Sequence, residues 1–293
     1  MSYSIDQFSK ISGISKLVLR TWENRYNYLE APRTKTKLRL YSDLLLVKAL
    51  KTKLLIDSGY KISFISSINE DELDQLTTKL KNSANRDTSF DYYISKMIES
   101  GIKYDADLFN EIYDECVINF NHIEIYTNIM LPTFSKIGLF WLTNRMNPAQ
   151  EHFLSEMFKQ KVYSEIDKIK ITNTKRKTWL LFLPPNEHHE IGLLFSRFLL
   201  IKNGFNVIYL GANVPLNAVE QVYKAINPHN ILFFTISNFA KSDLSNTTSF
   251  LGKKLEKAKK YIVANSVLET KFLKKNNIIL INNIQKFLKL LSI

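Results

Sequence analysis

From residue 178 onward the chain alternates between short apolar runs and longer amphipathic stretches, and this alternation constrains the fold more than any other feature. The apolar runs lie at 178–183, 206–210, 230–236, 261–264 and 278–281 and have the length of buried strands. The stretches at 190–203, 215–226, 244–258, 268–275 and 284–291 have the length and apolar spacing of helices. Strands joined by crossover helices predict an α/β domain with a doubly wound parallel sheet over residues 176–293.

The loop between the first strand and the first helix of this domain carries the pattern Glu-x-His-x-x-Gly, formed by Glu187, His189 and Gly192. It follows the carboxyl end of a strand, where open α/β sheets bind their ligands. A neutral imidazole is a good ligand for a transition metal, and a nearby carboxylate fixes its tautomer and raises its basicity. The pattern therefore indicates a metal-ligating histidine, with a solvated loop of no function as the alternative.

Residues 90–172 show helical spacing throughout and predict a four-helix bundle, with helices near 90–100, 105–121, 122–142 and 148–168. The small polar residues at 82–89 predict a linker before it. Trp141 lies at the end of the third helix, while Glu151 and His152 lie near the start of the fourth. On these residues alone, a core tryptophan and a surface Glu-His pair remain the alternative to a ligand contact.

Residues 1–80 predict an all-α winged helix-turn-helix domain that binds double-stranded DNA. Two short helices join at Gly13, and the second would enter the major groove. A basic β-hairpin, or wing, follows. The first 61 residues hold 12 Lys and Arg against 5 Asp and Glu, and a basic surplus in one segment is typical of a nucleic-acid partner. The predicted DNA contacts are Lys16, Arg20 and Arg25 on the helix and Arg33, Lys35, Lys37 and Arg39 on the wing.

A single cysteine, Cys116, excludes a disulfide framework and fits a reducing compartment. No apolar run approaches the ~20 residues of a membrane span, and the N-terminus lacks the apolar core of a signal peptide. We therefore expect a cytoplasmic protein with no membrane partner.

The N-terminal segment resembles the DNA-binding domain of the MerR family of transcription regulators. The resemblance rests on Tyr3-Ser-Ile, Gly13-Ile-Ser, Leu19-Arg-Thr-Trp-Glu-Asn-Arg-Tyr26 and Arg39-Leu-Tyr-Ser42, and covers about residues 1–70. The family usually has glycines at the tip of the wing, where this chain has Thr34-Lys-Thr-Lys37. The resemblance implies a transcription regulator rather than an enzyme.

The histidine loop resembles the Asp-x-His-x-x-Gly loop in the Rossmann-like cobalamin-binding module of methionine synthase and corrinoid proteins, with Glu187 in place of the aspartate. The resemblance implies that His189 is the lower axial ligand of cobalt and that Ser237 holds the nucleotide tail. The order of the three segments resembles the CarH/CarA/LitR group of B12-dependent regulators. That resemblance implies adenosylcobalamin as the cofactor, a homo-oligomer (dimer or tetramer) and a response to light. It also implies that Trp141, Glu151 and His152 surround the upper face of the corrin.

Two features, involving three residues, depart from that group. Ala264-Asn265 replaces two glycines that leave room for the nucleotide tail, and Leu142 replaces a histidine that ligates cobalt after photolysis in light-sensing members. Two further interpretations therefore stay open. One is a regulator of the same architecture that has lost its cofactor and acts through protein contacts, and the other is a corrinoid methyl-carrier protein.

Overall fold

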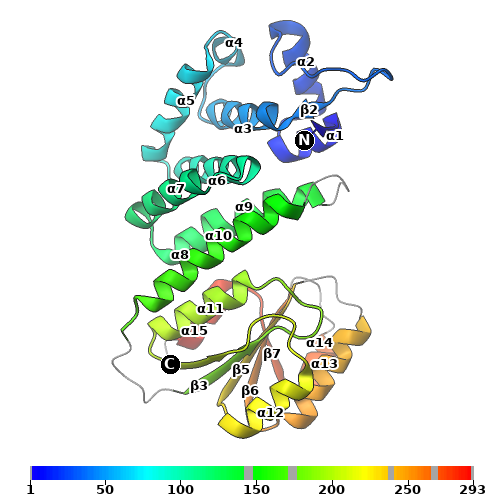
Figure 1. The fold of residues 1–293 in the computed structure, drawn as a ribbon, viewed down its shortest axis with the longest axis vertical. Coiled ribbons are helices and arrows are strands. Elements are labelled where there is room, and N and C mark those ends of the chain that lie inside the picture. Colours follow the sequence, from blue (N-terminus) through cyan, green and yellow to red (C-terminus); the bar gives the residue numbers. More distant parts are fainter. Residues whose placement is uncertain (1, 142–147, 171–176, 237–240, 265–269, 292–293) are drawn as a thin grey trace. The chain divides into compact units, whose positions relative to one another are not determined.

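The computed structural model describes residues 2–141, 148–170, 177–236, 241–264 and 270–291 (Figure 1). The chain divides into two compact units, 1–157 and 158–293, and the division falls within the helix α10 (Pro148–Asp167). Among the described residues, no helix combines the length and the apolar character needed to cross a membrane.

Three helices of the winged helix-turn-helix segment begin at serine caps, and the segment is helical as predicted. Ser4, Ser15 and Ser42 each accept a hydrogen bond from a backbone N–H in the first turn of the following helix. Gly13 ends the first helix with a φ of +71°, the left-handed conformation that glycine adopts at low cost. The elements are β1 (Ser2–Tyr3), α1 (Ile5–Ser12), α2 (Lys16–Tyr26), β2 (Tyr41–Ser42), α3 (Asp43–Asp57), α4 (Ile62–Ile65), α5 (Glu70–Lys79) and the 3-10 turn η1 (Leu80–Asn82).

Long helices follow in the predicted places. The connection after η1 is shorter than the predicted linker at 82–89, because Ser89 is buried inside the next helix and donates a hydrogen bond to Lys81 O at 2.6 Å. Pro132 has no N–H for a helical hydrogen bond, and a wide π turn precedes it. The elements are α6 (Arg86–Lys103), α7 (Ala106–Asn119), α8 (His122–Glu124), the π turn η2 (Ile125–Met130), α9 (Leu131–Trp141) and α10.

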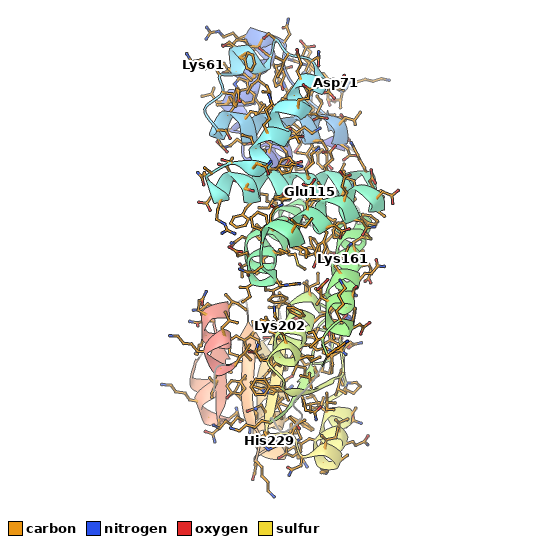
Figure 2. All side chains as sticks on the ribbon, turned by 90° about the vertical axis from the view of Figure 1, so that its left-hand side faces the viewer. Lys61, Asp71, Glu115, Lys161, Lys202 and His229 are labelled. Carbon is orange, nitrogen blue, oxygen red and sulfur yellow. The ribbon has the colours of Figure 1, made fainter. Side chains whose placement is uncertain are left out.

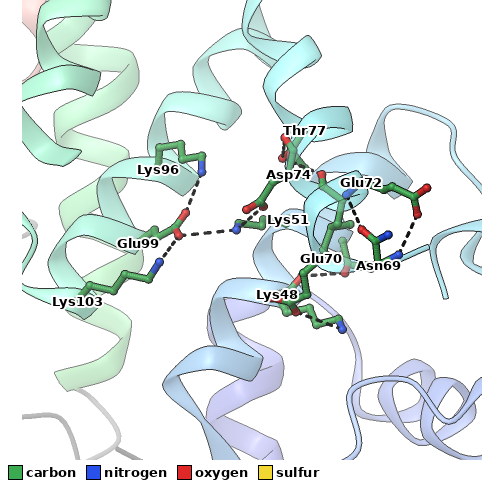
Figure 3. A network of polar contacts seen from close by, with 12 residues as sticks. Lys48, Lys51, Asn69, Glu70, Glu72, Asp74, Thr77, Lys96, Glu99 and Lys103 are labelled. Carbon is green, nitrogen blue, oxygen red and sulfur yellow. Dashed lines mark hydrogen bonds and ion pairs between the residues drawn. The ribbon is translucent and has the colours of Figure 1, made fainter. Parts of the chain in front are cut away.

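Within the first unit, the winged helix-turn-helix segment packs on the helical segment through α3 against α6 and α1 against α9. Lys51 of α3 is buried at this contact, where its Nζ lies 2.5 Å from Asp74 Oδ1 of α5 and 3.7 Å from Glu99 Oε1 of α6 (Figure 3). Glu99 also accepts hydrogen bonds from Lys103 at 2.6 Å and Lys96 at 3.1 Å. Because an unpaired buried charge is costly, this network ties α3, α5 and α6 together.

The described residues of the second unit contain a five-stranded parallel sheet, which confirms the predicted doubly wound α/β domain. In chain order the strands lie 2-1-3-4-5 across the sheet, so the direction of winding reverses between the first and third of them. The strands are β3 (Thr178–Phe182), β4 (Asn206–Tyr209), β5 (Asn230–Thr235), β6 (Lys259–Ala264) and β7 (Ile278–Ile281), in the spatial order β4-β3-β5-β6-β7.

Helices cover both faces of this sheet (Figure 1). On one face, Val219, Leu251 and Leu273 of three helices pack in a buried cluster with Leu180 of β3. Trp179 points to the other face, since neighbouring residues of a strand alternate, and contacts Phe287 of the last helix with ring centroids 6.5 Å apart. The helices are α11 (Ile191–Lys202), α12 (Leu216–Ile226), α13 (Lys241–Lys254), α14 (Thr270–Lys275) and α15 (Ile284–Leu291).

The two ends of the sheet differ. His229, labelled in Figure 2, lies at the amino end, where its Nδ1 accepts a hydrogen bond from Thr178 N at 3.2 Å. The parallel register of β3 and β5, with Phe182 beside Phe233, brings their carboxyl ends together at the opposite edge. The histidine loop, residues 184–190, follows β3 at that edge.

Candidate functional site

The histidine loop is anchored to the loop after β4. Asn186 N donates to Asn213 Oδ1 at 2.9 Å, and Asn213 N donates to Glu187 O at 3.1 Å. Both asparagines have a positive φ, 65° and 54°, which asparagine adopts more readily than most residues. Sequence reasoning missed both asparagines, although an asparagine between apolar runs is a typical turn residue.

Glu187 is fully buried and organises the loop. Its Oε1 accepts hydrogen bonds from the backbone N–H groups of His188 at 2.9 Å and His189 at 3.0 Å, and lies 2.7 Å from His189 Nδ1. Its Oε2 accepts from Ile236 N at 2.6 Å, directly after β5. A buried carboxylate needs such donors, so this side chain joins the imidazole to the ends of β3 and β5, where the winding of the sheet reverses.

The side chain of His189 is 58% exposed at this edge. Because its Nδ1 faces the Glu187 carboxylate, we expect that a metal would be bound through Nε2. Gly192 lies in the first turn of α11, and its carbonyl accepts a hydrogen bond from Ser196 Oγ at 2.9 Å. The structure thus brings Glu187 and His189 together, while their role toward cobalt stays a prediction.

Among the residues that the structure describes, no group of three or more His, Cys, Asp or Glu side chains is arranged to hold a metal ion.

The other predicted cofactor residues lie on helices of the first unit or outside the described residues. Trp141 is the last residue of α9, and Glu151 is half-buried in the first turn of α10, where Ser155 Oγ donates to its Oε1 at 2.9 Å. His152 is exposed. Ala264 is the last residue of β6. Ser237, Leu142 and Asn265 lie outside the described residues.

The recognition helix α2 presents its predicted DNA contacts to solvent. Leu19 and Trp22 are buried and fix the inner face of the helix, whereas Lys16, Arg20 and Arg25 are exposed. Lys16 pairs with Asp6 of α1, and the Arg25 guanidinium lies 5.4 Å from the ring centroid of Tyr26. An exposed basic face on a helix held by two buried apolar residues suits the major groove.

The wing is a tight hairpin fastened to α2. Arg33 and Arg39 form an antiparallel bridge, and Thr34 N donates to Leu38 O at 2.9 Å. Arg39 Nε donates to Glu23 Oε2 on α2 at 2.6 Å, and the Arg39 side chain is only 18% exposed. Arg33 Nη2 reaches the same carboxylate at 3.4 Å. That Glu23 would hold the wing arginines was not predicted from the sequence. An acidic residue within so basic a segment could have indicated an ion pair with them.

The remaining wing residues, Lys35 and Lys37, are exposed at the tip. Lys37 has a φ of +61°, the left-handed conformation for which the MerR family usually supplies glycine at this tip. The tip therefore keeps the hairpin geometry and adds a cation, at the cost of backbone strain in a residue with a side chain.

A basic winged helix-turn-helix, a helical segment and a parallel α/β domain with a histidine at its switch point define a modular DNA-binding protein with a separate ligand-binding domain. Comparison with known proteins agrees. Residues 3–71 match the MerR HTH family regulatory proteins, and residues 93–164 match the B12 binding domain family.

The chain is 24% identical over 260 residues to the HTH-type transcriptional repressor CarH of Myxococcus xanthus, covering 87% of this chain and 85% of CarH. It is 23% identical over 233 residues to the repressor CarA of the same organism, covering 78% of this chain and 74% of CarA. The monomethylamine corrinoid protein of Methanosarcina barkeri has a related fold, with 13% identity, a TM-score of 0.51, and coverage of 67% of this chain and 94% of that one. The chain thus combines a MerR-type segment with a B12-binding segment and is homologous to the CarH and CarA repressors.

Proposed function

We infer that this chain is a DNA-binding transcriptional regulator that responds to cobalamin. The inference rests on the MerR and B12 matches within one chain and on homology to two repressors along most of its length. One structural observation supports the cofactor most directly. An exposed imidazole is oriented by a buried carboxylate at the ligand-binding edge of a parallel sheet.

The residues at this edge fit a corrinoid. His189 would hold the cobalt through Nε2, and Glu187 would fix the orientation of the ring. Ala264 adds only a methyl group at the end of β6, where the cobalamin module has a glycine. When bound, the cofactor would supply a cobalt centre with an exchangeable upper ligand.

We propose adenosylcobalamin as the bound form. Trp141 would lie against its upper ligand, Glu151 would accept hydrogen bonds from ribose hydroxyls, and His152 would complete this upper face. Ser237 would hold the nucleotide tail. The bound form would make the response sensitive to light. Because the side chain of Leu142 cannot ligate cobalt, that position would supply no second protein ligand.

The DNA site would comprise α2 and the wing, and the assembly a homo-oligomer, because one helix-turn-helix reads a single half-site. Residues 1–80 would bind DNA, 90–172 would cover the cofactor, and 176–293 would hold it, in a cytoplasmic regulator without catalytic activity. The proposed DNA contacts are Lys16, Arg20, Arg25, Arg33, Lys35, Lys37 and Arg39, of which Arg39 also fastens the wing through Glu23.

A second candidate is a regulator of the same architecture that binds no cobalamin. Ala264-Asn265 in place of two glycines favours it, since two added side chains would leave less room for the nucleotide tail. A corrinoid methyl carrier is disfavoured, because a MerR-type segment has no use in methyl transfer.

Absorbance of the protein after incubation with adenosylcobalamin in the dark and gel filtration tests the cofactor. We expect cobalamin to co-elute with the wild type and with His188→Ala. His189→Ala should bind at least about tenfold more weakly, or give the spectrum of cobalamin without a protein imidazole, because the lower ligand is lost. A wild type without cobalamin would favour the second candidate. Loss of binding in His188→Ala alone would reverse the assignment of the two histidines.

A further inference from the structure

A cluster of five side chains lies beside the histidine loop in the second unit and is not explained by the metal ligand or its carboxylate. It joins three elements, α10, α11 and β4, to the loop residue that directly follows His189. Its members are Lys159 and Tyr163 of α10, Glu190 of the loop, Arg197 of α11 and Tyr209 of β4.

Glu190 is the residue through which the loop is held. Its Oε1 accepts a hydrogen bond from Tyr209 Oη at 2.8 Å, and its Oε2 lies 3.5 Å from Lys159 Nζ. The side chains of Lys159 and Glu190 are 20% and 17% exposed, so solvent screens this pair less than it would a surface pair. The site is also tight, because a Cβ added at Gly211 would come within 3.2 Å of Glu190 Oε1.

Arg197 lies against the rings of Tyr209, a partner of Glu190, and Tyr163 of α10. Its guanidinium carbon lies 5.1 Å from the ring centroid of Tyr209 and 5.8 Å from that of Tyr163. A cation between two aromatic faces restrains both rings. Tyr209 therefore keeps its hydroxyl toward Glu190, and α10 is restrained beside β4.

We propose that Lys159 and Tyr209 are positioning residues, which act through Glu190 to set the orientation of His189 toward the cobalt. This inference rests on the proposed function. Groups in the outer shell of a metal orient the ligands in the inner shell, and small displacements there weaken coordination. The backbone of Glu190 continues from His189, so a carboxylate held from two sides limits the movement of the imidazole.

The test compares three variants with the wild type. Lys159→Met removes the cation and keeps the length of the side chain, and Tyr209→Phe removes the hydroxyl and keeps the ring next to Arg197. Lys224→Met is the matched control, because Lys224 of α12 pairs with Glu220 one turn away and its side chain is 69% exposed. Lys159→Arg restores the positive charge and serves as the rescue.

Two readouts are measured on the full chain. The first is amide hydrogen exchange of residues 186–190 without any ligand, which we expect to quicken about threefold or more in Lys159→Met and Tyr209→Phe. The second is the absorption spectrum with adenosylcobalamin, which we expect to shift toward that of cobalt lacking the imidazole. Lys159→Arg should return both readouts toward wild type, and Lys224→Met should change neither.

The outcomes separate the inference from the proposed function. Unchanged exchange and an unchanged spectrum in both variants would overturn the positioning role, as would faster exchange with no spectral shift. A wild type that takes up no cobalamin would overturn the proposed function and with it a role toward cobalt, whatever the exchange rates. Equal effects of Lys224→Met and Lys159→Met would show a general loss of stability and would also overturn the inference.

Discussion

At the scale of single residues, three glutamates with little exposed surface each organise basic or imidazole partners. The side chain of Glu23 is 11% exposed and pairs with the wing arginines. The side chain of Glu99 is 6% exposed and contacts three lysines. The side chain of Glu187 is 0% exposed and contacts His189. A buried carboxylate is tolerated only where donors surround it, so its partners are held in defined positions. Local charge pairing thus shapes the proposed DNA site, the contact between the two segments of the first unit, and the histidine loop.

Glu99 makes a prediction about pH. Burial alone would raise the pKa of its carboxyl group, but the hydrogen bond from Lys103 and the charges of Lys96 and Lys51 outweigh burial and lower that pKa below the usual 4.5. A carboxyl whose pKa is lowered by folding stabilises the protein above its unfolded pKa. That contribution is lost as the pH falls through the folded pKa. We therefore expect Glu99→Gln to lower the free energy of unfolding by about 2 kcal/mol at pH 7, and by progressively less below pH 4.5.

Denaturant unfolding of wild type and variant between pH 7 and pH 3 measures this difference. Glu70→Gln is the control, because Glu70 pairs with Lys48 of α3 at 3.3 Å while its side chain is 72% exposed (Figure 3). An exposed pair contributes about 0–1 kcal/mol, so that variant should show little pH dependence of its own. Equal pH dependence in the two variants would refute the special role of the buried network.

At the scale of elements, the wing combines a strained backbone with a cation. We predict that Lys37→Gly raises the free energy of unfolding by about 1 kcal/mol, since glycine adopts a positive φ without strain. The same change should weaken DNA binding and reduce its salt dependence by about 0.9 log units per log unit of salt, if Lys37 contacts one phosphate. Lys35→Ala should reduce the salt dependence of DNA binding by the same amount, but it should not raise the free energy of unfolding. The comparison uses DNA that the protein selects from a random-sequence pool. The affinity of each variant for this DNA is measured at several salt concentrations.

The packing of α6 against α10 makes a second prediction at this scale. A Cβ at Gly101 would lie 2.4 Å from Leu154 Cδ1, so Gly101→Ala should lower the free energy of unfolding by about 1–3 kcal/mol. Gly138→Ala on α9, where no atom of the described residues lies within 4 Å of the added Cβ, should instead raise it by about 0.5–1 kcal/mol. Thermal unfolding of both variants checks this, and a stability loss in Gly138→Ala as large as in Gly101→Ala would contradict the close packing.

At the scale of the whole molecule, most of the architecture could be predicted because apolar periodicity reports burial directly. The last strand and helix, at 278–281 and 284–291, have the predicted bounds. β6 begins at Lys259, two residues before the predicted strand at 261–264. The predicted strand was too short because Lys259 and Lys260 are not apolar. Lys260 is nonetheless buried, and its ammonium donates to Leu255 O at 2.9 Å and Ala258 O at 3.2 Å.

The details that could not be predicted depend on partners distant in the chain. The two-residue pairing of β1 with β2 is too short to leave a periodic pattern. Lys51 meets Glu99, and Tyr209 meets Glu190, only after folding, so spacing along the chain carries no signal for either contact. The pairing of Glu187 with His189 is different, because two residues of separation bring a carboxylate within reach of the imidazole.

DNA affinity measured with and without adenosylcobalamin tests the central claim most directly. A ligand shifts DNA binding only as far as it prefers one state of the protein over the other. On DNA selected by this protein from a random-sequence pool, in the dark and at constant salt, we expect adenosylcobalamin to raise the affinity of the wild type at least about tenfold, or ~1.4 kcal/mol. His189→Ala should bind the same DNA with no such gain. Equal affinities of the wild type with and without the cofactor would contradict the account.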